Sequence, residues 1–224
     1  MKNNYKLLKI FILTSMSIII ILFSSEKIFA QKIKFDLSYG LYNTKVKFHH
    51  SSDVDDKGTD IANGNSFSFG ITSKIKNNLF LNTEIGLLST KSFISIIYNY
   101  DEGFGEKHSV LLSWIQNERV YFGIMPEYRK SIKHFDYYIK GGVLLANDIK
   151  NYSSTLNDVF PIKTKPVLGL KLNTGLNWNI GIIALKFDVG FMTFTKSQLI
   201  NTYHPYISYT NFGANIGVVY SLGK

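Results

Sequence analysis

The chain has 224 residues, a formal net charge of +9 and no cysteine. The lack of cysteine excludes disulfide-stapled secreted folds and cysteine chemistry. The positive charge is spread along the chain rather than gathered in a block, so we expect no nucleic-acid partner. Tyr and Phe are abundant, at 14 and 17 copies, and Pro is scarce, at 4. This balance is typical of long strands flanked by aromatic girdles at a membrane surface.

The first 30 residues have the layout of a secretory signal peptide. Lys2, Lys6 and Lys9 precede an uncharged apolar run at 10–23, and the segment ends at Ala30. The apolar run is shorter than the roughly 20 residues that a membrane-spanning helix requires. We therefore predict that residues 1–30 are a cleavable signal peptide and that the rest of the chain is exported.

Residues 31–224 alternate apolar and polar side chains with the two-residue period of a β-strand. Eight strands are predicted, at 33–42, 66–75, 79–87, 119–129, 135–145, 168–178, 183–191 and 212–222. Short turns at 77–78, 132–134 and 179–181 alternate with long connections at 49–65, 89–119, 146–165 and 195–205. Even strand number, short turns and longer external loops are typical of outer-membrane barrels.

The connection at 89–119 allows two interpretations. It contains two further β-like pieces, 93–100 and 110–114, around a glycine-rich stretch at 101–106. We favour a long hairpin that extends beyond the bilayer. The alternative is two additional spanning strands, which would make ten.

Pro126 falls on the outward face of the strand predicted at 119–129. Proline has no N–H to donate to a strand ladder, and a closed barrel has no free edge at which this would be harmless. We therefore expect a β-bulge at Pro126.

The polar faces of the strands carry many charges. These residues are Lys34, Lys74, Arg119, Arg129, Lys140, Lys171 and Lys186, with Asp36, Glu84, Glu127, Asp136 and Asp188. In a membrane barrel they would point into the lumen, where eight strands leave room only for side chains. Because an isolated buried charge costs several kcal/mol, we expect ion pairs and trapped water rather than a wide pore. In a soluble barrel the same residues would form the outer surface.

Residues suited to catalysis or metal binding are few. The histidines fall in predicted loops or turns, at His49, His50, His108, His134 and His204. One loop could hold a metal ion, with calcium among the candidates, through His49, His50, Asp53, Asp55 and Asp56. A solvated loop is the simpler interpretation. The neighbours His108 and Ser109 would point to opposite faces of a strand. We therefore predict no catalytic, cofactor-binding or metal-binding residues.

Three stretches carry a resemblance to a known family: 120–128, with a proline followed by tyrosine; 137–143, with a glycine pair; and 213–220, at the end of the last strand. Together they resemble the small outer-membrane β-barrel proteins of Bacteroidota, of the porin-family or PorT-like type. The resemblance covers nearly the whole of residues 31–224. It implies an outer-membrane location and a barrel fold, and it transfers no functional residues.

These observations predict an all-β protein, a single closed antiparallel up-and-down transmembrane barrel of residues 31–224 in the outer membrane. We expect no enzyme activity and no cofactor, with external loops that serve envelope integrity, adhesion or a secretion apparatus. The expected partners are outer-membrane lipid, the barrel-assembly machinery and envelope or secretion proteins. The alternatives are a narrow porin-like channel or transporter biased towards anions, a lipid-modifying barrel enzyme, and a soluble periplasmic ligand-binding barrel.

Overall fold

The computed structural model describes residues 33–49, 59–101, 106–154, 159–161, 163–164, 166–195, 197–200 and 206–222. The predicted signal peptide lies outside these residues. Within them, no helix is long and apolar enough to cross a membrane.

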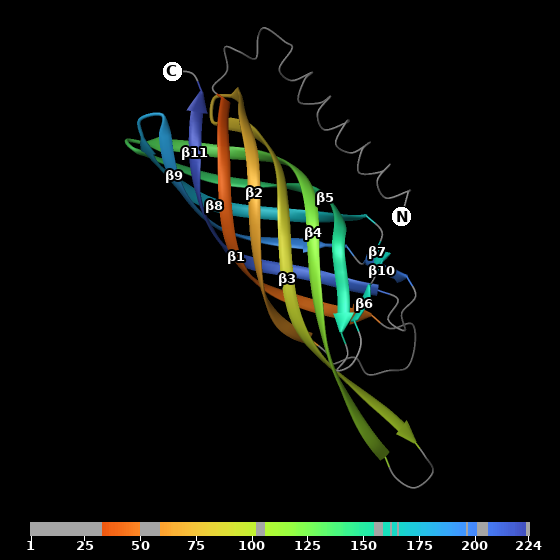
Figure 1. The fold of residues 1–224 in the computed structure, drawn as a ribbon. Coiled ribbons are helices and arrows are strands. Elements are labelled where there is room, and N and C mark those ends of the chain that lie inside the picture. The colour runs from red at the N-terminus through yellow and green to blue at the C-terminus, as the bar shows by residue number, and fades with distance from the viewer. Residues whose placement is uncertain are drawn as a thin grey trace.

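Antiparallel strands make up the whole of the described fold (Figure 1). The wall is formed by β1 (Ile33–His49), β2 (Thr59–Lys76), β3 (Leu79–Asp101), β4 (Glu106–Ile132), β5 (Phe135–Ser154), β8 (Val167–Ile180), β9 (Ile183–Phe194) and β11 (Tyr206–Leu222). Shorter strands lie in the connections: β6 (Val159–Pro161), β7 (Lys163–Thr164) and β10 (Ser197–Ile200). Each wall strand pairs with its neighbours, and β1 also pairs with β11, which closes the barrel. The predicted closed eight-stranded barrel is therefore confirmed.

Three tight turns lie at one end of the barrel, together with the start of β1 and the end of β11 (Figure 1). We call this end the short-turn mouth. The turns are Asn77-Asn78, Lys133-His134 and Gly181-Ile182. The first residue of each has a positive φ, of 45°, 53° and 69° respectively, which asparagine and glycine adopt readily. The turn at 77–78 is confirmed, whereas the other two are shorter or displaced by one residue from the predicted 132–134 and 179–181.

At the opposite end, several strands are longer than predicted. Residues 59–65, 146–154 and 197–200 lie in strands rather than in the loops assigned to them. These stretches are polar, and polar composition by itself predicts an irregular loop. The backbone pairing continues all the same, for example between Asn43 and Asn63. Strands that extend beyond an apolar belt need no apolar side chains to keep their ladder.

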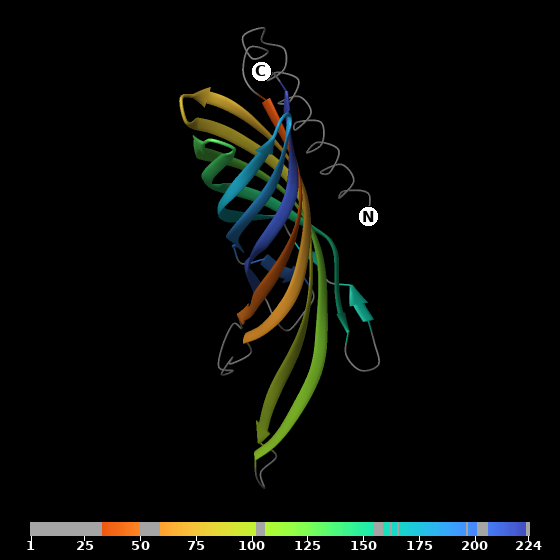
Figure 2. The same ribbon diagram turned by 90° about the vertical axis from the view of Figure 1, so that its left-hand side faces the viewer.

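The β3–β4 hairpin projects far beyond the other strands (Figures 1 and 2). Its register runs without a break from Leu79↔Tyr128 to Asp101↔Glu106. The neighbouring strands stop earlier: β2 pairs with β3 only as far as Lys91, and β5 pairs with β4 only as far as Trp114. The long hairpin is thus confirmed, and the ten-stranded alternative is wrong.

The β-bulge predicted at Pro126 is also wrong. The β4–β5 register is the same at Ile124↔Val143 and at Glu127↔Lys140, so no extra residue is inserted between them. The irregularity in this pair of strands lies instead between Glu118 and Arg119.

Two glycines of β5 face the interrupted ladder at Pro126. Between the two intact pairs, Gly142 stands opposite Met125 and Gly141 stands opposite Pro126. A Cβ on Gly142 would lie 2.1 Å from the carbonyl oxygen of Ile124 and 2.8 Å from the Cα of Met125. The barrel therefore accommodates the proline by close backbone approach rather than by a bulge.

Gly142→Ala is expected to lower the free energy of unfolding by about 4 kcal/mol or more, because the added Cβ meets backbone atoms that are fixed in a ladder. The unboiled protein should fail to show the altered gel mobility of a folded barrel. Gly141→Ala is the matched control, since its Cβ would meet a flexible side-chain atom, Cδ1 of Leu172, at 3.0 Å. Equal folding of both variants would contradict this account of the glycine pair.

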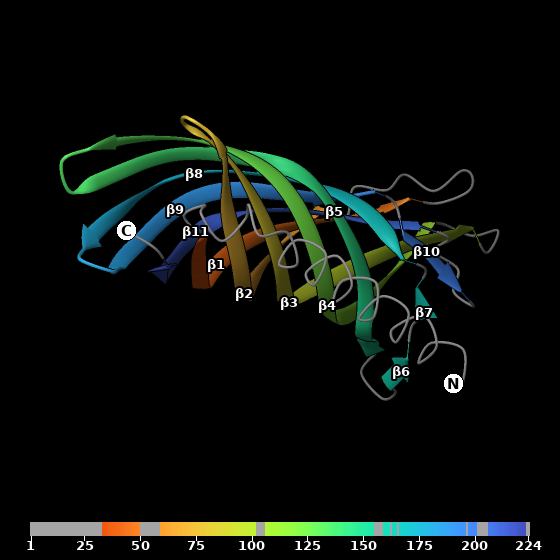
Figure 3. The same cartoon turned by 90° about the horizontal axis from the view of Figure 1, so that it is seen from above.

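The outward face of the wall is apolar, and the inward face carries the charges. Leu41, Leu168 and Phe212 are 63%, 61% and 65% exposed, whereas Glu84 and Lys140 are 1% and 2% exposed. Viewed from above, the wall strands form one continuous curved layer (Figure 3). This arrangement is the reverse of a soluble barrel, which keeps its apolar face inside.

Candidate functional site: the lumen and the short-turn mouth

Glu84 of β3 is the centre of the charged layer in the lumen. Its Oε2 lies 3.1 Å from Nζ of Lys140, and its Oε1 accepts a hydrogen bond from Nζ of Lys171. The hydroxyl of Tyr121 donates to Oε1 at 2.7 Å. These side chains come from four consecutive strands of the wall, β3, β4, β5 and β8, so the contacts tie these strands together across the lumen. One carboxylate thus pairs with two ammonium groups that water scarcely reaches.

A second cluster is built around Lys186 of β9. Its Nζ lies 3.0 Å from Oδ1 of Asp36 and 3.4 Å from Oδ2 of Asp188. Asp188 also accepts hydrogen bonds from Asn173 at 2.6 Å and from Tyr138 at 2.8 Å. Each carboxylate therefore has several donors, as a buried charge requires.

Asn82 connects the two clusters. Its Nδ2 donates to Oδ2 of Asp36 at 3.4 Å and to Oγ1 of Thr72 at 2.7 Å, and its Oδ1 accepts from Nζ of Lys140 at 3.4 Å. The polar side chains consequently form one network across the lumen. Such a network blocks a wide water-filled path.

Further from the short-turn mouth, the interior holds a large apolar cluster. The cluster consists of Tyr42, Leu88, Tyr121, Leu144, Ala146, Val167, Met192, Phe194 and Tyr209. The guanidinium of Arg119 lies within this half, 4.6 Å from the ring centre of Phe194 and 4.7 Å from that of Tyr209. Its Nε donates to Oδ1 of Asp148 at 2.5 Å. The apolar cluster, this ion pair and buried polar side chains such as Thr44 fill the interior beyond the charged layer.

Asp148 was missed at the level of sequence because residues 146–165 were assigned to a loop. The strand pattern contained the missing signal. The even-numbered residues of β5 face inward from Asp136 to Lys140, and continuing the same parity leads to Asp148. With it, the ion pairs described in the barrel join six cations, Lys34, Arg119, Arg129, Lys140, Lys171 and Lys186, to six anions, Asp36, Glu84, Glu127, Asp136, Asp148 and Asp188. The predicted ion pairing is confirmed.

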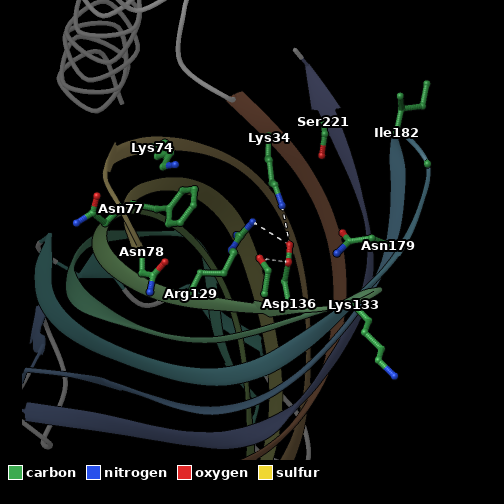
Figure 4. Close-up of a pocket in the computed structure, with 13 residues that line it drawn as sticks. Lys34, Lys74, Asn77, Asn78, Arg129, Lys133, Asp136, Asn179, Ile182 and Ser221 are labelled. Carbon is green, nitrogen blue, oxygen red and sulfur yellow. Dashed lines mark hydrogen bonds and ion pairs between the residues drawn. The ribbon is translucent and has the colours of Figure 1, made fainter. Parts of the chain in front are cut away.

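At the short-turn mouth the lumen opens into a recess of about 630 Å³ (Figure 4). Nζ of Lys34 lies 2.8 Å from Oδ2 of Asp136, which also accepts from the Ser131 hydroxyl, through Oδ1, at 2.6 Å. Nε of Arg129 donates to Oε1 of Glu127 at 2.7 Å. Lys74, which we predicted to point into the lumen, lines this recess at the mouth of the lumen.

The histidines and their neighbours do not form a site in the described residues. His49 and His108 lie in β1 and β4 rather than in loops, and His134 is exposed in the β4–β5 turn. The other candidate metal ligands, His50, Asp53, Asp55 and Asp56, lie outside the described residues, as does His204. In the described part of the chain, no group of three or more His, Cys, Asp or Glu side chains could hold a metal ion.

Comparisons with known proteins establish the fold. No protein-family model and no curated protein sequence matches the chain. The structure is similar to the outer membrane protein OprG from Pseudomonas aeruginosa, with a TM-score of 0.58, 10% identity and coverage of 87% of this chain and 97% of that chain. It is also similar to the outer membrane protein AlkL, determined in DMPC lipid bilayers, with a TM-score of 0.53, 14% identity and coverage of 87% and 91%.

A third similar structure is the outer membrane protease OmpT from Escherichia coli, with a TM-score of 0.50, 11% identity and coverage of 85% of this chain and 97% of that chain. The three proteins differ in what their names describe, and the identities are low. What they share with this chain is the architecture. The chain has the closed antiparallel β-barrel fold of outer-membrane proteins, while the resemblance to PorT-like proteins stays a prediction.

Proposed function

We propose that this chain is an integral outer-membrane protein without a catalytic role, whose barrel anchors the β3–β4 hairpin on the outside of the cell. Residues 1–30 direct export and are removed. The wall contacts outer-membrane lipid, and the barrel-assembly machinery inserts it. The hairpin contacts a partner that serves envelope integrity, adhesion or secretion. The apolar outer face and the likeness to outer-membrane barrels support the location.

The observation that carries this proposal is the two-stranded ribbon at the end of the hairpin, from Ile94↔Ser113 to Asp101↔Glu106. A two-stranded ribbon is only marginally stable in water by itself. Its outer edges continue past the last pairs with β2 and β5, and open edges of this kind accept a further strand. The sequence there is rich in apolar residues: Ile94, Ile96, Ile97, Val110, Leu111 and Leu112. These features suit a surface that a partner covers.

The filled lumen favours an anchor over the alternative of a narrow channel. An anion bias was expected from seven inward cations against five anions, but the ion pairs inside the barrel balance at six and six. Arg119, Tyr121 and Lys140 are at most 2% exposed, so they occupy the path that ions would need. We expect no steady conductance in planar bilayers.

Shortening the hairpin tests the proposal. Residues 94–113 are replaced by Asn-Gly, which joins the directly opposed pair Phe93↔Trp114 through a two-residue turn. The shortened protein should still reach the outer membrane and show heat-dependent gel mobility. In a strain that lacks the native gene, it should fail to restore the detergent resistance or surface attachment that the full chain restores.

A matched control replaces the Gly181-Ile182 turn by Asn-Gly, which alters the opposite end and leaves the hairpin intact. This variant should restore both properties. Full restoration by the shortened hairpin would show instead that the barrel itself performs the function, and a measured single-channel conductance would then identify a channel.

A further inference from the structure

The recess at the short-turn mouth is more basic than the rest of the lumen. Its lining includes Lys34, Lys74, Arg129 and Lys133, with Asp136 as the carboxylate among the lining residues. Glu127 is not itself part of the lining, but it forms an ion pair with Arg129. Lys133 points away from Arg129 and Asp136 (Figure 4), so three cations face these two carboxylates and one positive charge is in excess. The recess therefore has the charge to hold an anion.

Arg129 supplies a built donor for such a group. Its side chain is 5% exposed, yet its Nη1 has no hydrogen-bond partner. The nearest carboxylate oxygen to this nitrogen is Oδ2 of Asp136, at 3.8 Å, beyond hydrogen-bond range. Phe80 packs 4.8 Å from the guanidinium carbon, and Glu127 holds Nε, so the orientation of the planar group is fixed. A preorganised guanidinium suits the oxygens of a phosphate or carboxylate group.

The remaining lining provides a neutral donor and a second cation. Asn179, near the end of β8, faces the recess (Figure 4). Nζ of Lys34 points to Asp136, a partner that an incoming anion could replace (Figure 4). The recess opens along the barrel axis, because it is lined by inward-facing residues and by the turns. A molecule entering it comes from solution at this mouth rather than from the lipid around the wall.

We propose that the recess at the short-turn mouth binds a soluble oxyanion, a phosphate monoester or a dicarboxylate, between Arg129, Lys34 and Lys74. The same chemistry could be offered by the phosphodiester of a lipid headgroup, and the experiment separates the two sources. This site is independent of the hairpin at the opposite end, so it stands or falls separately from the proposed anchoring function.

Isothermal titration calorimetry on the protein folded in uncharged detergent micelles tests the proposal with inorganic phosphate as the probe. We expect saturable binding that weakens about tenfold in Lys34→Gln, since one charge-assisted contact is lost. Asp136→Asn should bind phosphate more tightly than the wild type, because it removes a competing carboxylate and frees Lys34. A purely structural role of these residues would not produce opposite changes in affinity.

Lys130→Gln is the matched control: it removes one positive charge from the same strand as Arg129 but from its outward face, and its affinity should equal that of the wild type. Lys74→Gln, at the rim, replaces Lys34→Gln if the latter does not fold. Absence of saturable heat, or equal weakening by Lys130→Gln, would overturn the site. Displacement of phosphate by short-chain phosphatidylglycerol added to the micelles would overturn the soluble source.

Discussion

Glu84→Gln is expected to lower the free energy of unfolding by about 3–5 kcal/mol, the cost of leaving buried charges without their partner. The substitution keeps the shape of the side chain and removes the carboxylate that serves both Lys140 and Lys171. Water cannot replace it, because Glu84 is 1% exposed. Urea unfolding of the protein in lipid vesicles, followed by tryptophan fluorescence, measures the change.

A second variant separates charge from shape. Combining Glu84→Gln with Lys171→Met should recover part of the loss, since only Lys140 then lacks a carboxylate partner and it keeps Asn82 as an acceptor. If Glu84→Gln unfolds within 1 kcal/mol of the wild type, the charged layer does not hold the wall together as we infer.

Ile216→Arg should destabilise the protein by about 2–4 kcal/mol in a bilayer, the cost of an arginine on the lipid face near the midplane. Ile216 is 54% exposed on the outer wall, between Tyr39 and Phe187 of the adjacent strands. It lies well inside β11, away from either mouth. Unfolding in vesicles by urea, monitored as for Glu84→Gln, gives the change in free energy.

The control for Ile216→Arg is the same substitution at Ile182, which is 60% exposed in the turn at the short-turn mouth. Near the membrane surface an arginine costs only about 0–1 kcal/mol. A difference between the two sites demonstrates lipid contact, whereas equal and small effects would indicate that the outer wall faces water.

Much of the barrel could be predicted because strand alternation is a local property. The inward positions of Glu84, Lys140 and Lys186 follow from the parity of their own strands. Their partners do not, because Lys186 meets Asp36 across 150 positions of sequence, and only the register and stagger of the strands bring them together. The ends of the strands could not be predicted either, because polar residues beyond the apolar belt have the composition of a loop.

Pro126 illustrates the same limit within one strand. From the sequence of β4 alone, a bulge was the reasonable remedy for a missing donor. The actual remedy lies on the neighbouring strand, in Gly141 and Gly142, and it becomes visible only when the two strands are aligned.

The seam between β1 and β11 sets the order in which the protein can form. Tyr42 donates to Asn215 across it, over 173 positions of sequence, so this pairing has the greatest loop-closure entropy to overcome. Closure must follow synthesis of the last strand. Until then, the edge of β1 that pairs with β11 in the finished barrel has unpaired backbone groups, and these can pair with another chain. An escorting protein that covers this edge, released when β11 arrives, would therefore govern the yield of folded barrel more than the stability of the finished wall does.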